Sequence, residues 1–276
     1  MKHRYSFAMS LVAVTLVAAA PAAAQEEPAW APLDLSAFGS ELTDPWIPVP
    51  NGDSGAPRQG WLATADGFFT REAHLAYTYV DIQGDDFHQG LARFHYPLSR
   101  RFWAGVEVPF YQDRGGDSDF GDVTLTTQVM LAETRNLSFN AGVGWRLPTG
   151  SSSFGNNVFA ATPQLNLWTD VGSGFSIRGR VAYELNDSGQ SDAFAMNAAI
   201  GQTFTAHDKA PLGDLTWYVA GNWREPNQGS TFLSVTPGMR THLGGNLFAL
   251  AGVEIPVTNS NSTFREAFTF QLVQGF

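Results

Sequence analysis

Hydrophobic and polar residues alternate along most of the chain after about residue 70. In the segment 101–112, Phe102, Val106 and Phe110 share one register, while Trp103 and Glu107 fall in the other. Successive side chains of a β-strand point to opposite faces, so a period of two predicts one apolar and one polar face. The pattern therefore predicts strands and not helices, and no segment after the first 25 residues is long and apolar enough for a membrane-spanning helix.

Twelve segments carry this alternation, at about residues 70–82, 86–97, 101–112, 120–133, 136–149, 157–170, 174–186, 192–205, 214–225, 230–241, 245–257 and 263–276. Most are 11–14 residues long, whereas globular strands cluster near about 5–6 residues and membrane strands need about 9–11 residues within lipid. Between about residues 97 and 192 the connections alternate between short and long, as in outer-membrane barrels. Every backbone amide in lipid must pair within the protein, so such a sheet has to close. We predict an all-β fold, a transmembrane antiparallel up-and-down β-barrel of about 12 strands.

The first 69 residues differ from this pattern. Lys2 and Arg4 precede an apolar stretch at 7–20 and small residues at 22–24, an order typical of a secretory signal peptide. Residues 26–69 are rich in proline and contain Trp30, Trp46 and Trp61, without strand or helix periodicity. We divide the chain into a signal peptide (1–25), an N-terminal arm (26–69) and a barrel (70–276). The arm is interpreted as an ordered periplasmic segment, a plug in the lumen or a loose extension, and these alternatives stay open.

Charge and composition exclude several classes of partner and site. The chain has 16 basic and 26 acidic residues, and removing Lys2 and Arg4 with the signal leaves a formal net charge of −12. Nucleic-acid binding needs a basic surface, so no nucleic-acid partner is expected. The chain has no cysteine, which excludes disulfides and thiolate metal sites. No histidine or carboxylate cluster has the sequence spacing of zinc ligands, so we predict neither a metal site nor a cofactor.

The last predicted strand carries the most specific signal. Phe264, Phe268, Phe270 and Phe276 share one register, and the chain ends on the last of these. A terminal aromatic residue after an alternating strand resembles the C-terminal signal that the barrel-insertion machinery reads in outer-membrane proteins. We therefore expect three partners, namely that machinery through Phe276, outer-membrane lipid and lipopolysaccharide. The expected location is the outer membrane of a Gram-negative cell.

The polar faces of the strands should line the lumen. In the predicted register they carry ten charged candidates for lining residues: Arg93, Glu107, Asp122, Arg146, Arg178, Arg180, Glu184, Arg224, Arg240 and Glu254. A twelve-strand barrel is narrower than a sixteen-strand porin, so paired arginines and carboxylates can form either a packed structural network or a selectivity lining. Small residues on the same faces, such as Gly142 and Gly252, favour a restricted pathway.

Two motifs carry a family resemblance. Residues 120–125 read FGDVTL and residues 141–150 read AGVGWRLPTG. They resemble a Gly-Asp-hydrophobic strand start and a strand ending in Leu-Pro-Thr-Gly that are found in the outer-membrane proteins grouped as the MetA-pathway-of-phenol-degradation family. The resemblance extends over about residues 86–276. It implies a barrel that moves hydrophobic or aromatic compounds, and it supplies no site residues.

Three functions compete on these grounds. The preferred hypothesis is a channel or transporter-like barrel for passive passage of small solutes, and the alternative is a structural or adhesive barrel with an occluded lumen. An outer-membrane acyl hydrolase of the phospholipase A type would need a serine two residues from a histidine on one strand. The residues two positions after His74, His88, His95 and His242 are not serines. We therefore predict no enzyme and no catalytic residues.

Overall fold

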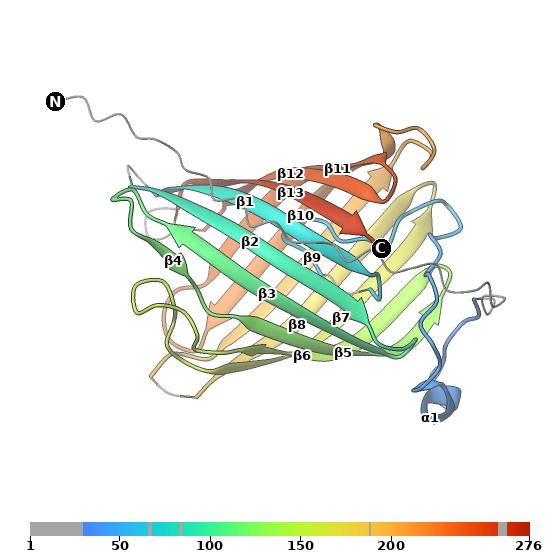
Figure 1. Cartoon of the computed structure of the whole chain (residues 1–276), viewed down its shortest axis with the longest axis horizontal. Coiled ribbons are helices and arrows are strands. Elements are labelled where there is room, and N and C mark those ends of the chain that lie inside the picture. The colour runs from blue at the N-terminus through green and yellow to red at the C-terminus, as the bar shows by residue number, and fades with distance from the viewer. Residues whose placement is uncertain (1–29, 66–67, 83–84, 188, 259–263) are drawn as a thin grey trace.

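The computed structural model describes residues 30–276 except 66–67, 83–84, 188 and 259–263. The predicted signal peptide therefore lies outside the described residues. Each long strand pairs antiparallel with its neighbour along the chain, and the first pairs with the last, which closes the ring (Figure 1). Within the described residues the twelve long strands are β1 (Glu72–Ile82), β2 (Asp85–Pro97), β3 (Phe102–Gln112), β5 (Thr124–Thr134), β6 (Leu137–Arg146), β7 (Ala160–Gly172), β8 (Phe175–Asn186), β9 (Ala193–Thr203), β10 (Gly213–Pro226), β11 (Phe232–Gly244), β12 (Leu247–Pro256) and β13 (Glu266–Gly275). The predicted closed barrel is confirmed.

The fourth predicted segment differs most from the observed strand, which begins at Thr124 and not at residue 120. Residues ahead of it form the three-residue strand β4 (Ser118–Phe120), which folds back on the end of β3. The Phe120 ring meets the Phe110 ring edge-on at 5.4 Å between centroids, and the amide of Gly121 donates to the carbonyl of Pro109. A side chain at Gly121 would stand 2.3 Å from the Tyr111 ring, so glycine permits this sharp return.

Short helical turns lie only in the arm among the described residues, as a 3₁₀ turn at Leu35–Ala37 and the helix α1 at Phe38–Glu41. Asp34 begins the first turn because its side chain accepts hydrogen bonds from the amides of Ser36 and Ala37. The bonds from Ser36 lower the pKa of the Asp34 carboxyl. No helix in the described part of the chain is long and apolar enough to cross a membrane.

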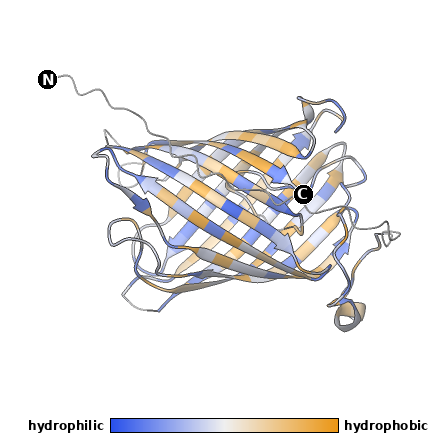
Figure 2. Cartoon of the chain, in the orientation of Figure 1, coloured by the Kyte–Doolittle hydropathy of each residue, from blue (hydrophilic) through white to orange (hydrophobic). Residues whose placement is uncertain are grey.

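The barrel wall has an apolar outer face and a polar inner face. Figure 2 shows the alternation along each strand. Large hydrophobic side chains such as Leu75, Leu165 and Phe270 are 59%, 47% and 49% exposed, while Asn166 and Thr216 are buried. A soluble domain would bury the hydrophobic side chains, so this distribution is that of a barrel surrounded by lipid.

Neighbouring positions on β7 provide a test of this arrangement. Leu165 points outward and Gln164 lies on the opposite face of the same strand. We expect Leu165→Arg to lower the free energy of unfolding in lipid vesicles by about 2–4 kcal/mol, because an arginine would then face hydrocarbon near mid-strand. Gln164→Arg should cost much less. Guanidinium titration of the vesicle-inserted protein measures both, and equal losses would contradict a lipid-facing Leu165.

Candidate functional site

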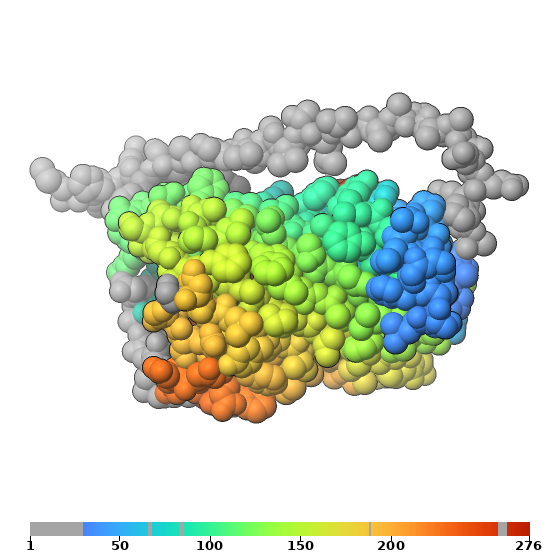
Figure 3. Space-filling model, turned by 90° about the horizontal axis from the view of Figure 1, so that it is seen from below, coloured from blue at the N-terminus to red at the C-terminus, as the bar shows by residue number. Residues whose placement is uncertain are grey.

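The described part of the arm, residues 30–65 and 68–69, docks at the end of the barrel where most turns are short. In Figure 1 the blue arm and α1 lie at the end that also holds the C-terminus, and in Figure 3 the blue atoms gather at that same end. Leu33 forms an antiparallel bridge with Glu133, with backbone hydrogen bonds of 2.8 Å in both directions. The amide of Asp53 donates to the side chain of Asn136 in the β5–β6 turn, at 2.8 Å. The arm is therefore attached to the rim of the barrel.

Beyond the rim, the arm packs on inward-facing side chains. The Trp61 ring stacks on the Tyr218 ring of β10, with centroids 5.0 Å apart and planes 4° apart. A side chain at Gly201 would stand 2.6 Å from the Trp61 ring, so a glycine in the wall makes room for the indole. Trp61 belongs to a buried cluster drawn from the arm and strands β9, β10, β12 and β13, whose members are Trp61, Leu62, Ala199, Tyr218, Ala220, Phe248, Leu250 and Val273.

Two further clusters lie on the other side of the ring. Phe68 packs with Trp168 of β7, and Phe69 packs with Trp103 of β3 and Met130 of β5. In the ring of twelve long strands, β3 is six positions from β10, and β7 is six positions from β13. Contacts on opposite sides mean that the arm spans the inside of the barrel at this end.

Arginines of the wall hold the arm's backbone. The guanidinium of Arg178 on β8 is fully buried and donates to the carbonyls of Pro57, Arg58 and Gln59 at 2.9, 3.1 and 2.5 Å. Arg240 on β11, 1% exposed, donates to the side-chain oxygen of Gln59 at 2.8 Å. Charge-assisted hydrogen bonds are stronger than neutral ones, so these contacts fix the position of residues 57–59.

A buried ion pair adds a second attachment. Arg58 of the arm lies 2.7 Å from Glu133 at the end of β5, and the two side chains are 1% and 3% exposed. Arg58 also donates to the carbonyl of Thr134 at 2.6 Å. Burial lowers the pKa of Arg58, an effect that the neighbouring Glu133 carboxylate opposes. Glu133 accepts from Trp30 and Arg100 as well, so one carboxylate serves three donors of the described chain.

A second set of charged side chains remains partly exposed to the interior. Arg93 of β2 lies 2.6 Å from Glu107 of β3. Glu184 of β8 lies 3.2 Å from Arg146 and 3.5 Å from Arg224. These five side chains are between 19% and 47% exposed. Glu184, Arg146 and Arg224 lie near the ends of their strands that lead into the long loops. The interior is therefore packed at the arm's end and accessible further along.

The strand pairings place most of the predicted lining residues on the inner face. Arg93 pairs with Glu107, Glu107 with Thr124, and Thr124 with Arg146 along one row of the wall. Two-residue spacing puts Arg178, Arg180 and Glu184 on one face of β8, and Glu254 joins Ser234 across the β11–β12 pair. Arg224 and Arg240 complete the inner-face group, and its role in lining a pore stays a prediction.

Asp122 is the exception. It lies outside the strands, just before β5, and is 7% exposed. Its carboxylate accepts hydrogen bonds from the amides of Gly150 and Asn156 at 2.9 and 2.7 Å. Asp122 therefore orders the loop between β6 and β7, which also explains why aspartate follows Gly121 in this sequence.

The structure brings together Glu72, His74 and His95, a buried cluster that the sequence analysis did not identify. Glu72 and His74 share a face because they are two residues apart on β1, and His95 is the cross-strand partner of Glu72 on β2. One register covers the whole β1–β2 pair, so the pairing of Ile82 with Asp85 also sets the pairing of Glu72 with His95.

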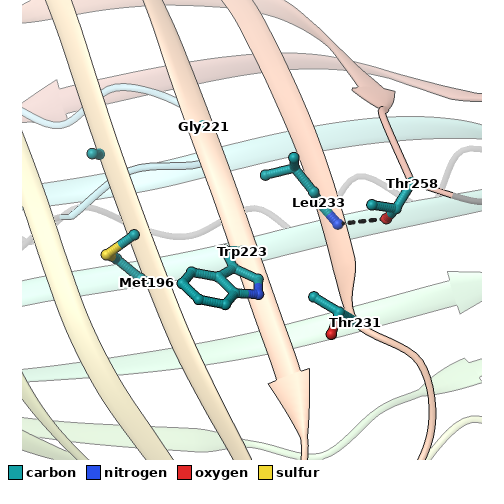
Figure 4. A pocket seen from close by; sticks show the side chains of 7 residues that line it. Met196, Gly221, Trp223, Thr231, Leu233 and Thr258 are labelled. Carbon is teal, nitrogen blue, oxygen red and sulfur yellow. Dashed lines mark hydrogen bonds between the residues drawn. The ribbon is translucent and has the colours of Figure 1, made fainter.

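A groove of about 440 Å³ lies on the outer wall and not in the interior (Figure 4). Small residues on β9 and β10 form its floor, and Met196 and Trp223, which are partly exposed, flank it. The amide of Leu233 donates to Thr258 at its edge, at 2.7 Å. Its walls are almost entirely apolar, so in a membrane the groove faces acyl chains and offers no aqueous path.

Sequence comparison places the chain in a family. A model of the family described as "Putative MetA-pathway of phenol degradation" matches residues 53–272. The chain belongs to this family. The match begins within the arm, so the family pattern of this MetA-pathway member includes part of the segment that enters the barrel. No curated protein matches the chain in sequence.

Porins are among the solved structures similar to this MetA-pathway family member. The KdgM porin aligns with a TM-score of 0.53 and 11% identity, over 74% of this chain and 99% of that one. The NanC porin aligns with a TM-score of 0.53 and 8% identity, over 75% and 98% of the two chains. A further KdgM structure, in complex with disordered oligogalacturonate, has a TM-score of 0.51. At these identities the similarity establishes a shared barrel fold.

Proposed function

We propose that the protein is an outer-membrane channel for passive passage of small solutes, with one mouth closed by the arm. The observation that carries this proposal is the division of the interior. Arg178 and Arg240 are buried against the arm, whereas Arg93, Glu107, Arg146, Glu184 and Arg224 remain partly exposed. A purely structural barrel has no need of an accessible charged interior beyond a packed end.

The interior also supports a class of solute. Phe87 and Tyr111 lie two-residue steps from Arg93 and Glu107 on their strands, which puts them on the same inner face. Their ring centroids are 5.3 Å apart, and Phe154 of the β6–β7 loop lies 6.0 Å from Tyr111. Aromatic rings bind other rings by offset and edge-on contacts. Together with the family's description, this cluster favours small aromatic or hydrophobic solutes.

Planar-bilayer recording of the purified full chain tests the channel. We expect discrete, infrequent openings whose ion selectivity depends on Glu184. Glu184→Gln removes the carboxylate between Arg146 and Arg224 and should shift the reversal potential toward anion selectivity. Glu225→Gln is the matched control, because Glu225 is exposed and faces away from the interior as the next residue after Arg224.

Two results would count against the channel. One is the absence of conductance both in the wild-type protein and after the arm has been released. The other is an identical reversal potential for Glu184→Gln and Glu225→Gln, which would mean that ions do not pass these side chains. The absence of conductance would favour a second candidate function, a structural barrel with a permanently occluded lumen. The observation that supports this alternative is the set of buried contacts that the arm makes on both sides of the ring.

A further inference from the structure

Three side chains with metal-binding atoms meet on the inner face of β1 and β2. Glu72, His74 and His95 are 1%, 2% and 3% exposed. The Nε2 atom of His74 lies 3.0 Å from Oε2 of Glu72, and the Nδ1 atom of His95 lies 3.9 Å from the same oxygen. All three candidate ligand atoms lie within 4.8 Å of one another. Around a tetrahedral zinc ion with bonds of about 2.0–2.2 Å, ligand atoms stand roughly 3.4 Å apart, so small side-chain movements close the site.

The carboxylate of Glu72 has few other partners. Among described residues its ion partners within 4.0 Å are the two imidazoles, the buried Arg240 guanidinium interacts with it from farther away, and its Oε1 atom accepts no hydrogen bond from a described residue. A buried carboxylate is unfavourable unless a cation and hydrogen bonds compensate it. A divalent metal ion between the three side chains supplies that compensation.

The surroundings hold the ligands in place. The side-chain amide of Gln271 on β13 lies 3.0 Å from Nδ1 of His74, which leaves Nε2 directed at Glu72. Amide oxygen and nitrogen are interchangeable by rotation, so Gln271 can accept from Nδ1 and leave the Nε2 lone pair for a metal. The Trp103 ring meets the His95 ring edge-on at 4.7 Å, and the arm residues Leu33 and Phe69 pack on Trp103.

We propose that Glu72, His74 and His95 bind one transition-metal dication of the zinc class beneath the arm. Two imidazoles and one carboxylate suit Zn²⁺, whereas Ca²⁺ and Mg²⁺ require mainly oxygen ligands. Three protein ligands leave the fourth position to water. The metal would join β1 to β2 at the place where the arm enters the barrel. This site is independent of whether the barrel conducts.

Metal binding is measured on the full chain refolded in detergent and stripped with a chelator. Equilibrium dialysis with Zn²⁺ followed by elemental analysis should give one zinc per chain, and Co²⁺ should give the intense visible absorption of a tetrahedral site. His74→Gln and Glu72→Gln should abolish both signals. Gln271→Ala should weaken zinc binding by about 10–100-fold, as loss of an outer hydrogen bond to a ligand does.

His88→Gln is the matched control, because His88 also lies on β2 but is on the outer face, where it contacts the Tyr77 hydroxyl. It should bind zinc as the wild type does. Folding of each variant is checked by heat-modifiable migration in gels. A wild-type chain that binds no zinc, or binding that survives in folded His74→Gln, overturns the proposal. The wild-type chain must itself bind zinc, so the proposal can be refuted even if a variant fails to fold.

Discussion

Replacing Arg178 with methionine is expected to raise the open probability of the proposed channel by about 100-fold. The fully buried guanidinium donates to three carbonyls of residues 57–59, and the substitution leaves these acceptors without their donor. Hydrogen bonds to charged groups contribute about 1.5–3 kcal/mol each. We therefore expect the free energy that docks the arm in the barrel to fall by about 3 kcal/mol, which is less than the sum of the three bonds. Each 1.4 kcal/mol changes an equilibrium tenfold, which gives the expected factor. Single-channel recording in planar bilayers measures it.

Arg224→Met is the matched control for this measurement. It removes an arginine from the same inner face, but Arg224 is 47% exposed and its ion partner is Glu184, which belongs to the wall and not to the arm. Its open probability should stay at the wild-type level, while its ion selectivity changes. If Arg178→Met and Arg224→Met open equally often, the contacts of Arg178 with the arm do not control the pathway.

Glu133→Ala is expected to release the arm to proteolysis. The substitution leaves Arg58 buried without its carboxylate, and it also removes the acceptor of Trp30 and Arg100. Breaking a buried ion pair by removing one partner costs about 3–5 kcal/mol. When a protein opens and closes faster than it is cut, the cleavage rate follows the open population. Limited trypsin digestion should therefore cut after Arg58 at least about 100-fold faster than in the wild type.

Glu254→Ala provides the comparison for Glu133→Ala. Glu254 is an inner-face carboxylate whose described contact is with Ser234, on a strand neighbour and not on the arm. Trypsin should cut this variant at the wild-type rate. Equal cleavage of both variants would show that a general loosening of the barrel, and not the Arg58–Glu133 pair, exposes the arm.

Local patterns in the sequence were sufficient to predict the barrel wall. The period of two in segments such as 101–112 indicates a strand with one apolar and one polar face. The observed β3 begins and ends within one residue of this predicted segment. The same periodicity put Arg93, Glu107 and Glu184 on the inner side of the wall. It failed at residues 120–123, because β4 turns back there by a contact between Phe120 and Phe110 that alternation does not encode.

Contacts between distant parts of the chain were not predictable in this way. The arm has no period, so the sequence left three alternatives for it, and the stacking of Trp61 on Tyr218 joins residues 157 positions apart. The Glu72, His74 and His95 cluster was missed for a different reason. A search for zinc-ligand spacing along the sequence does not include cross-strand partners, although strand pairing brings Glu72 and His95 face to face.

Closure of the ring between β1 and β13 leaves two possible orders for assembling the molecule. The arm leads directly into β1, the amide of Phe276 donates to the carbonyl of Arg71, and the Phe276 ring stacks on Phe94 of β2. The start of the wall, its last residue and the end of the arm therefore meet at one seam. The arm either lies inside the sheet before β1 pairs with β13, or it enters through an open end of the barrel after that pairing has formed. The assembly pathway, as well as the docking equilibrium of the arm, is thus expected to determine whether a newly folded barrel is closed by its arm.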